Sequence, residues 1–215
     1  PYIERFTYLI GNSSFSEKTI HELICLTDSM IFARTDESTV TFISPILLSS
    51  FLDPRYTKVC CDTFIRIVNK SFLHEYITSI CVKNAEEKSE KPTDLISLIL
   101  TVLLTNDSTY DIKAKVKSFV LLRHILYFLQ SHSNEVNPSK LTVQIVNVEF
   151  LNNIINLFDA ENVTKPKHLE MVVYSLLQIS LNDPSIPIVI CQSNVFEALL
   201  NLVNNPDTTY MVGIA

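Results

Sequence analysis

Glycine is nearly absent from this 215-residue sequence, which contains only Gly11 and Gly213. Loops that cradle the phosphates of dinucleotides or nucleoside triphosphates need several closely spaced glycines, because the backbone must approach the phosphates. Two glycines so far apart exclude such a loop. Apolar residues recur at intervals of three and four rather than alternating, and this pattern favours helices over strands.

The five cysteines show no metal-binding pattern. None of the five cysteines forms a CxxC pair or a cluster with histidine, so we expect no metal and no cofactor. Cys60 and Cys61 are adjacent within an apolar helical pattern, and Cys25 and Cys81 occupy similar patterns. We therefore expect buried free thiols in a reducing compartment.

Long apolar runs are also missing. The longest, Phe119 to Leu129, is interrupted by Arg123 and His124 and is about half as long as a bilayer span requires. Without a transmembrane segment or a signal peptide, a cytoplasmic or nuclear location is expected. The net charge of −6 argues against direct nucleic-acid binding, which needs basic residues to replace phosphate counterions. The start at Pro1 and the end at Ala215 suggest a fragment of a longer protein.

What the sequence does contain is an internal repeat. Residues 94–130 and 149–185 align without a gap, apolar on apolar, for example at Val116/Met171, Phe119/Tyr174 and Leu121/Leu176, where 174 − 119 = 55. A fixed period of this size is typical of stacked helical repeats. We predict an all-α chain that forms an α-solenoid over residues 1–215 as a single domain, with its clearest repeats at 94–148 and 149–207. Leu121 and Leu176 should be buried.

The helical pattern also places the elements along the chain. Helices are expected over 2–10, 16–31, 41–53, 56–70, 72–80, 94–104, 112–129, 149–158, 167–181, 188–191 and 195–203, and a short helix or a turn over 141–146. Polar stretches predict loops at 35–38, 85–92 and 131–139.

The C-terminal stretch from Val172 to Val203 resembles an armadillo repeat. Val172-Val-Tyr-Ser-Leu-Leu-Gln-Ile-Ser180 is similar to the family's long helix, and Asn194 stands where the family usually has its turn glycine. HEAT-like or hybrid repeats are the alternative. The resemblance implies a right-handed superhelix whose concave groove binds other proteins.

The sequence departs from the nuclear-import members of that family, which line the groove with tryptophan and asparagine. No tryptophan is present, and the corresponding positions carry Tyr174/Gln178, Phe119/Arg123 and Phe64/Val68. Binding of basic localisation peptides is therefore not expected. The aromatic column of Phe64, Phe119 and Tyr174 is either a partner-binding surface or packing between repeats.

A basic column forms the second candidate surface. Lys58, Lys113 and His168 are separated by successive steps of 55, and their basic neighbours are Lys117, Lys165 and Lys167. Stacked repeats would bring these side chains to one edge, where they would attract an acidic or phosphorylated segment of a protein partner. The alternative is a solvated edge of the helices.

No catalytic residues are predicted, because the five histidines are scattered and none has a nucleophile or carboxylate at a relay spacing. We expect a non-enzymatic scaffold or adaptor that binds a peptide or a helical partner. One alternative is a regulatory domain of a larger signalling or cytoskeletal protein. A helical enzyme is the other alternative, and it would need a deep pocket with converging side chains.

Overall fold

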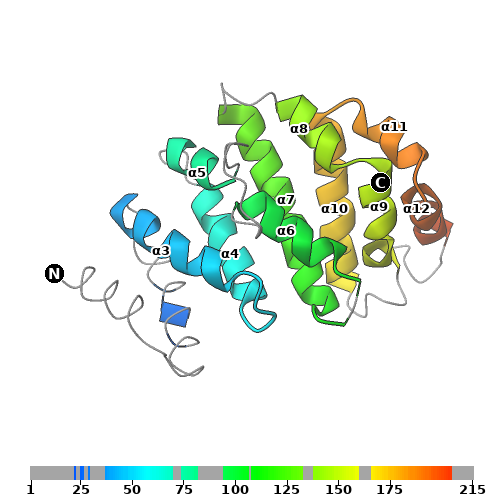
Figure 1. Ribbon diagram of the computed structural model, residues 1–215. Coiled ribbons are helices and arrows are strands. Elements are labelled where there is room, and N and C mark those ends of the chain that lie inside the picture. The colour runs from blue at the N-terminus through cyan, green and yellow to red at the C-terminus, as the bar shows by residue number, and fades with distance from the viewer. Residues whose placement is uncertain are drawn as a thin grey trace. The chain divides into compact units, whose positions relative to one another are not determined.

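A computed structural model describes residues 37–69, 74–81, 94–106, 108–132, 138–159 and 166–204, together with Glu22, Cys25, Leu26 and Ser29 (Figure 1). The all-helical prediction is confirmed, because the described residues form helices joined by turns and contain no strand. The chain divides into two compact units, residues 1–98 and 99–215. The helix expected over 2–10 and the loop expected over 85–92 lie outside the described residues.

The N-terminal unit contains three described helices, α3 (Glu37–Ser50), α4 (Thr57–Val68) and α5 (His74–Cys81). Helices α3 and α4 pack against each other, and Phe51 lies 6.3 Å from Phe64 between ring centroids. The turn between them is fixed by Asp53, whose carboxylate accepts a backbone hydrogen bond from Arg55 and pairs with its guanidinium at 2.6 Å. Asp53 therefore ends one helix and orients the next.

Helix α3 differs from the sequence prediction in three respects, the first being that it ends at Ser50 rather than at residue 53. It begins at Glu37 rather than at residue 41, because burial of Thr39 and Val40 rewards a helical conformation beyond the local propensity. It also continues through Pro45, which cannot donate the usual hydrogen bond to the carbonyl of Thr41. The hydroxyl of Tyr76 donates to that carbonyl instead, at 3.4 Å.

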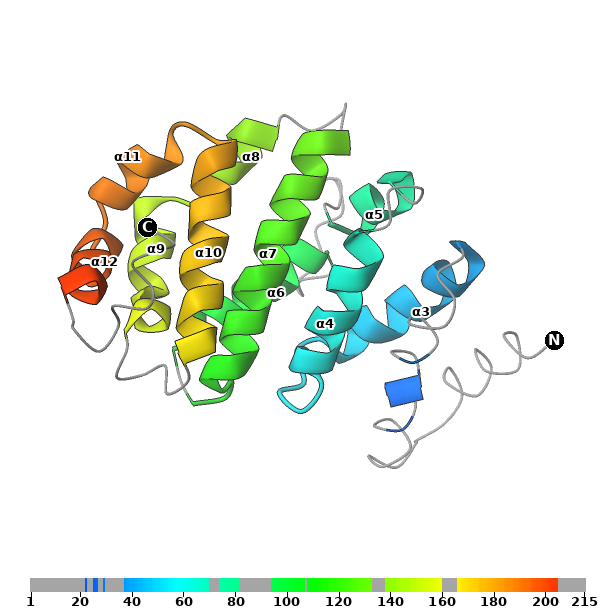
Figure 2. The ribbon, with the colours of Figure 1, turned by 180° about the vertical axis from the view of Figure 1, so that it is seen from behind.

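The C-terminal unit is built around two long helices, α7 (Ile112–His132) and α10 (Pro166–Asn182). They pack side by side, as both views of the ribbon show (Figures 1 and 2). Helix α6 (Leu95–Leu104) precedes them and contains the boundary between the two units. The remaining elements are α8 (Pro138–Ile145), α9 (Val148–Asn153), the 3-10 helix η2 (Ile155–Phe158), α11 (Ile186–Cys191) and α12 (Val195–Asn204).

Side-chain caps set where several helices begin. Asp111 accepts a hydrogen bond from the backbone of Ala114 at the start of α7, and Asn147 accepts one from Phe150 at the start of α9. At the start of α6, Asp94 likewise accepts a hydrogen bond from the backbone of Ser97. Each cap satisfies a backbone donor that the helix leaves unpaired at its N-terminus.

Further boundaries differ from the prediction. Helix α7 ends at His132 and helix α8 begins at Pro138, so both enter the loop expected over 131–139. The single helix expected over 149–158 is divided into α9 and η2. Asn152 and Asn153, which are weak helix formers, lie at the division, and the side chain of Asn152 accepts a hydrogen bond from the backbone of Asn194. Helix α11 begins at Ile186 rather than 188, because Pro187 is accepted in its first turn.

The core of the C-terminal unit forms where η2 packs against α7, α10 and α12. Phe119 is fully buried there, with its ring centroid 6.5 Å from Phe150 and 6.3 Å from Phe158. Leu121 and Leu176 are both buried, as predicted. The stacking of repeats into a solenoid, the single domain over 1–215 and the armadillo resemblance stay predictions.

Candidate protein-binding surface on α7 and α10

Helices α7 and α10 run in the same direction, as two contacts between them show. The guanidinium carbon of Arg123 lies 5.8 Å from the ring centroid of Tyr174, and the side-chain amide of Gln130 donates to the carbonyl of Asn182 at 2.6 Å. The residue numbers differ by 174 − 123 = 51 and 182 − 130 = 52. A nearly constant difference means parallel helices in register, so side chains about 51 residues apart lie at the same level.

The outer face of α7 carries a row of side chains at alternating steps of four and three. We call this row the α7 stripe; it consists of Lys113, Lys117, Val120, His124, Tyr127 and Ser131. Helical geometry places residues at these steps on one face. Lys113, Tyr127 and Ser131 are exposed, and Tyr127 is 56% exposed. Lys117 and His124 are partly buried, and Val120 is buried.

Helix α10 has a matching row, the α10 stripe, which consists of Lys167, Glu170, Tyr174, Gln178 and Leu181. Tyr174 is 45% exposed and Leu181 is 70% exposed. Because the helices are parallel, the lysines of both stripes lie near the same end, whereas Tyr127 and Leu181 lie toward the other end. The two stripes thus pass from basic to aromatic and apolar along the helices.

Arg123 lies where the two stripes meet. Its side chain is half-buried, and burial lowers the pKa of its guanidinium, while the phenol of Tyr174 acts in the opposite direction. One terminal nitrogen contacts Nε2 of His124. The Nε–H of Arg123 is buried and has no hydrogen-bond acceptor among the residues that the structure describes. The arginine is therefore positioned by an aromatic ring and an imidazole rather than by a carboxylate.

His124 is the neutral partner of this arginine. Burial, followed by the nearby charge of Arg123, lowers the pKa of the imidazole to about 4. A neutral imidazole has one nitrogen that accepts a hydrogen bond. Nε2 of His124 can consequently accept from the guanidinium at neutral pH.

The structure brings together some of the side chains that the sequence singled out. Arg123 and Tyr174 are in contact, and the half-buried Gln178 lies one turn beyond Tyr174. Lys113, Lys117, Lys167 and His168 all lie in the first two turns of α7 or α10.

Other predicted members do not reach this surface. Phe119 and Phe64 are fully buried in the cores of different units, which favours packing over partner binding for these two rings. Lys58 lies in the first turn of α4, in the N-terminal unit. Lys165 lies outside the described residues.

Sequence reasoning missed Tyr127, His124 and Leu181 as members of a surface. The signal was present, because steps of four and three lead from Lys113 through His124 to Tyr127. The spacing alone does not show which face of α7 is packed against neighbouring helices and which is exposed. Leu181 in particular aligns with Leu126, which is only 5% exposed.

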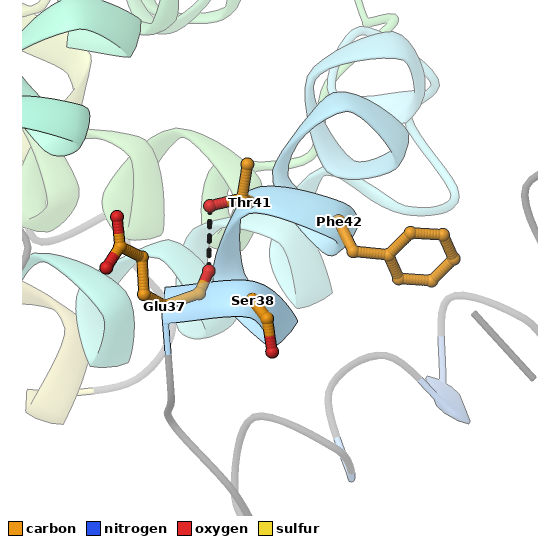
Figure 3. A pocket seen from close by; sticks show the side chains of 4 residues that line it. All are labelled: Glu37, Ser38, Thr41 and Phe42. Atoms are coloured by element: carbon orange, nitrogen blue, oxygen red, sulfur yellow. Dashed lines mark hydrogen bonds between the residues drawn. The ribbon is translucent and has the colours of Figure 1, made fainter. Parts of the chain in front are cut away.

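A shallow hollow against α3 is a weaker candidate (Figure 3). It is lined by Glu37, Ser38, Thr41 and Phe42. The hydroxyl of Thr41 donates to the carbonyl of Glu37 at 2.7 Å, so it is already engaged within the helix. The ring of Phe42 points away from the carboxylate of Glu37 (Figure 3). These four side chains do not converge on a common point.

The described residues contain neither a metal-binding cluster nor a membrane-spanning helix. No three histidine, cysteine, aspartate or glutamate side chains gather there in a way that could hold a metal ion. Within that part of the chain, every helix is too short or too polar to cross a bilayer. Cys60, Cys61 and Cys81 are buried free thiols, as expected, whereas Cys25 is exposed.

Comparison of the chain with protein-family models, with curated proteins and with solved structures gives no match.

Proposed function

We propose that this chain is a non-enzymatic, protein-binding helical module, a scaffold or adaptor that holds a peptide or a helix of a partner across the α7 and α10 stripes. The observation that carries this proposal is the exposure of Tyr127, Tyr174 and Leu181 on neighbouring parallel helices. Large aromatic and apolar side chains gathered on a surface characterise protein-binding sites.

Parallel helices suit a partner that lies along or across them. Tyr174 and Leu181 are two turns apart on one helix, a separation of about 10 Å. A partner helix or extended segment can place apolar side chains at that spacing. The lysines at the other end would attract an acidic or phosphorylated part of the same segment, since opposite charges steer association.

A peptide-display selection against the full chain tests this function. Peptides that bind the parent protein are then measured against Tyr174→Ala and Leu181→Ala, and each substitution is expected to weaken binding about tenfold or more, the effect typical of a residue central to an interface. Ile188→Ala is the matched control, because Ile188 is 61% exposed on another helix, α11, and belongs to neither stripe.

The proposal fails if the selected peptides bind both stripe variants as tightly as the parent. It also fails if Ile188→Ala weakens binding as much as Leu181→Ala does, since exposed apolar area of any kind would then explain the selection.

A further inference from the structure

Arg123 carries a charge that no described part of the chain compensates. One terminal nitrogen of its guanidinium contacts Nε2 of His124, and the guanidinium lies over the ring of Tyr174. Among the described residues, no carboxylate lies within ion-pair distance of Arg123. By contrast, Arg55 is held by the carboxylate of Asp53 at 2.6 Å.

Such an arrangement is unfavourable for the protein alone. A guanidinium taken partly out of water loses hydration, and an anionic partner normally offsets this loss. The buried Nε–H finds no acceptor in the described part of the chain, and leaving a buried charged donor without a hydrogen bond costs free energy. Neither Tyr174 nor the neutral His124 supplies a negative charge.

The same arrangement suits an incoming oxyanion. The cation–π contact with Tyr174 and the contact with His124 restrict the guanidinium, and a preoriented guanidinium can bind two oxygens of a carboxylate or phosphate at once. Lys117 is six residues earlier on α7, about 9 Å along the helix, and adds positive charge nearby. Glu170 lies one turn before Tyr174 on α10 and is the acidic member of the stripes.

We infer that Arg123 is a receptor for an oxyanion, the carboxylate or phosphate group carried by the protein segment that binds the two stripes. This inference rests on the proposed function and adds to it the chemical group that the partner must present. It also moves the anion site from the lysines expected from the sequence to the junction of α7 and α10.

Nuclear magnetic resonance of the arginine Nε–H groups tests the inference directly. The full chain, labelled with ¹⁵N, is titrated with inorganic phosphate, with acetate, and with chloride at matched ionic strength. The Arg123 signal is assigned by its loss in Arg123→Lys. We expect the Arg123 signal to shift and saturate with phosphate or acetate at millimolar concentration, and to move little with chloride.

Arg55 is the internal control in the same spectra, because its guanidinium is already bound to Asp53. A larger response to phosphate than to acetate identifies a phosphorylated segment as the source of the oxyanion, and the reverse identifies an acidic side chain. If phosphate and acetate move the Arg123 signal no more than chloride does, or no more than they move Arg55, the inference is overturned.

Substitution supplies a second readout. A bound anion stabilises the folded protein, so phosphate or acetate should raise the thermal midpoint of the parent. Arg123→Lys keeps the positive charge but cannot bind two oxygens at once; it should therefore lose this anion-dependent rise, while its midpoint without anion stays within a few degrees of the parent. An arginine with a purely structural role would instead lower the midpoint and show no anion response. The proposed function is judged separately, by the dependence of peptide binding on Tyr174 and Leu181.

Discussion

Three leucines on α7 and α10 differ in burial, so the same substitution, leucine to alanine, can show how burial determines its effect on stability. Leu121 and Leu176 are 0% and 2% exposed, whereas Leu181 is 70% exposed on the same helix as Leu176. Each is replaced by alanine in turn. We expect Leu121→Ala and Leu176→Ala to destabilise the protein strongly and Leu181→Ala to leave the stability nearly unchanged.

The expected magnitudes follow from the burial of each side chain. Removing a fully buried leucine side chain loses its transfer free energy and leaves a cavity, which together cost about 2–5 kcal/mol in the free energy of unfolding. Leu181 has little transfer free energy to lose, and exposed substitutions usually change stability by no more than about 0.5 kcal/mol. Alanine also has a slightly higher helix propensity than leucine. The gap between the two classes should therefore be at least about 1.5 kcal/mol.

Urea denaturation followed by far-ultraviolet circular dichroism measures these differences. With a denaturant slope of roughly 2 kcal/mol per molar, the midpoints of Leu121→Ala and Leu176→Ala should fall by about 1 M or more. The slope itself should stay the same, because these substitutions change packing rather than the surface exposed on unfolding.

Equal midpoints for all three variants would refute the reasoning, since burial would then not decide the cost. A large loss for Leu181→Ala alone would refute it more severely, because it would place Leu181 in a core and remove it from the α10 stripe.

Three further predictions concern titration, association and thiol reactivity. Because folding lowers the pKa of His124 to about 4, the unfolded chain takes up a proton first as pH falls. The stability due to the neutral imidazole is therefore complete above about pH 6.5 and is lost between about 6.5 and 4. In His124→Gln, the urea midpoint should depend less on pH between about 6.5 and 4 than it does in the parent. If the midpoint depends on pH equally in both proteins, the lowered pKa of His124 is not the cause. Lys113→Glu should slow association with a selected acidic peptide and make the association rate less dependent on salt, as measured by stopped flow. The reason is that exposed charges act over roughly 8 Å at physiological ionic strength. Lys140→Glu on α8 is the control, and equal association rates for the two variants would show that the lysines of the stripes do not steer the peptide. Burial raises the pKa of the Cys60 and Cys81 thiols, so a thiol reagent should label the exposed cysteines quickly and reach the buried ones only on unfolding; fast labelling of all five would contradict the burial of Cys60, Cys61 and Cys81.

Most helices could be located from the sequence because the three-and-four spacing of apolar residues is a local property. Helices α6, α7, α10 and α12 begin and end close to the expected residues. Two of the boundaries that moved depend on burial or on contacts with distant residues. Burial of Thr39 and Val40 extends α3, and Asn152 is tied to Asn194, which is 42 residues away.

The candidate site was only partly predictable. Arg123 and Tyr174 could be singled out by their repeat positions, but a repeat position does not determine exposure. Phe119 and Tyr174 occupy the same repeat position, yet the first is fully buried and the second is 45% exposed. Exposure depends on which neighbouring elements cover a helix, and that information lies in distant parts of the chain.

The sequence by itself determined that the chain is helical, that Leu121 and Leu176 are buried, and that no glycine-rich phosphate loop can form. These properties follow from the residue types and from the period of the α-helix. Only the tertiary structure decided that Arg123 contacts Tyr174, 51 residues away, and that no carboxylate of the described residues pairs with its guanidinium. The reason is physical: a charge is compensated or orphaned by groups brought near it in space, and the spacing of residues along the chain does not specify those groups.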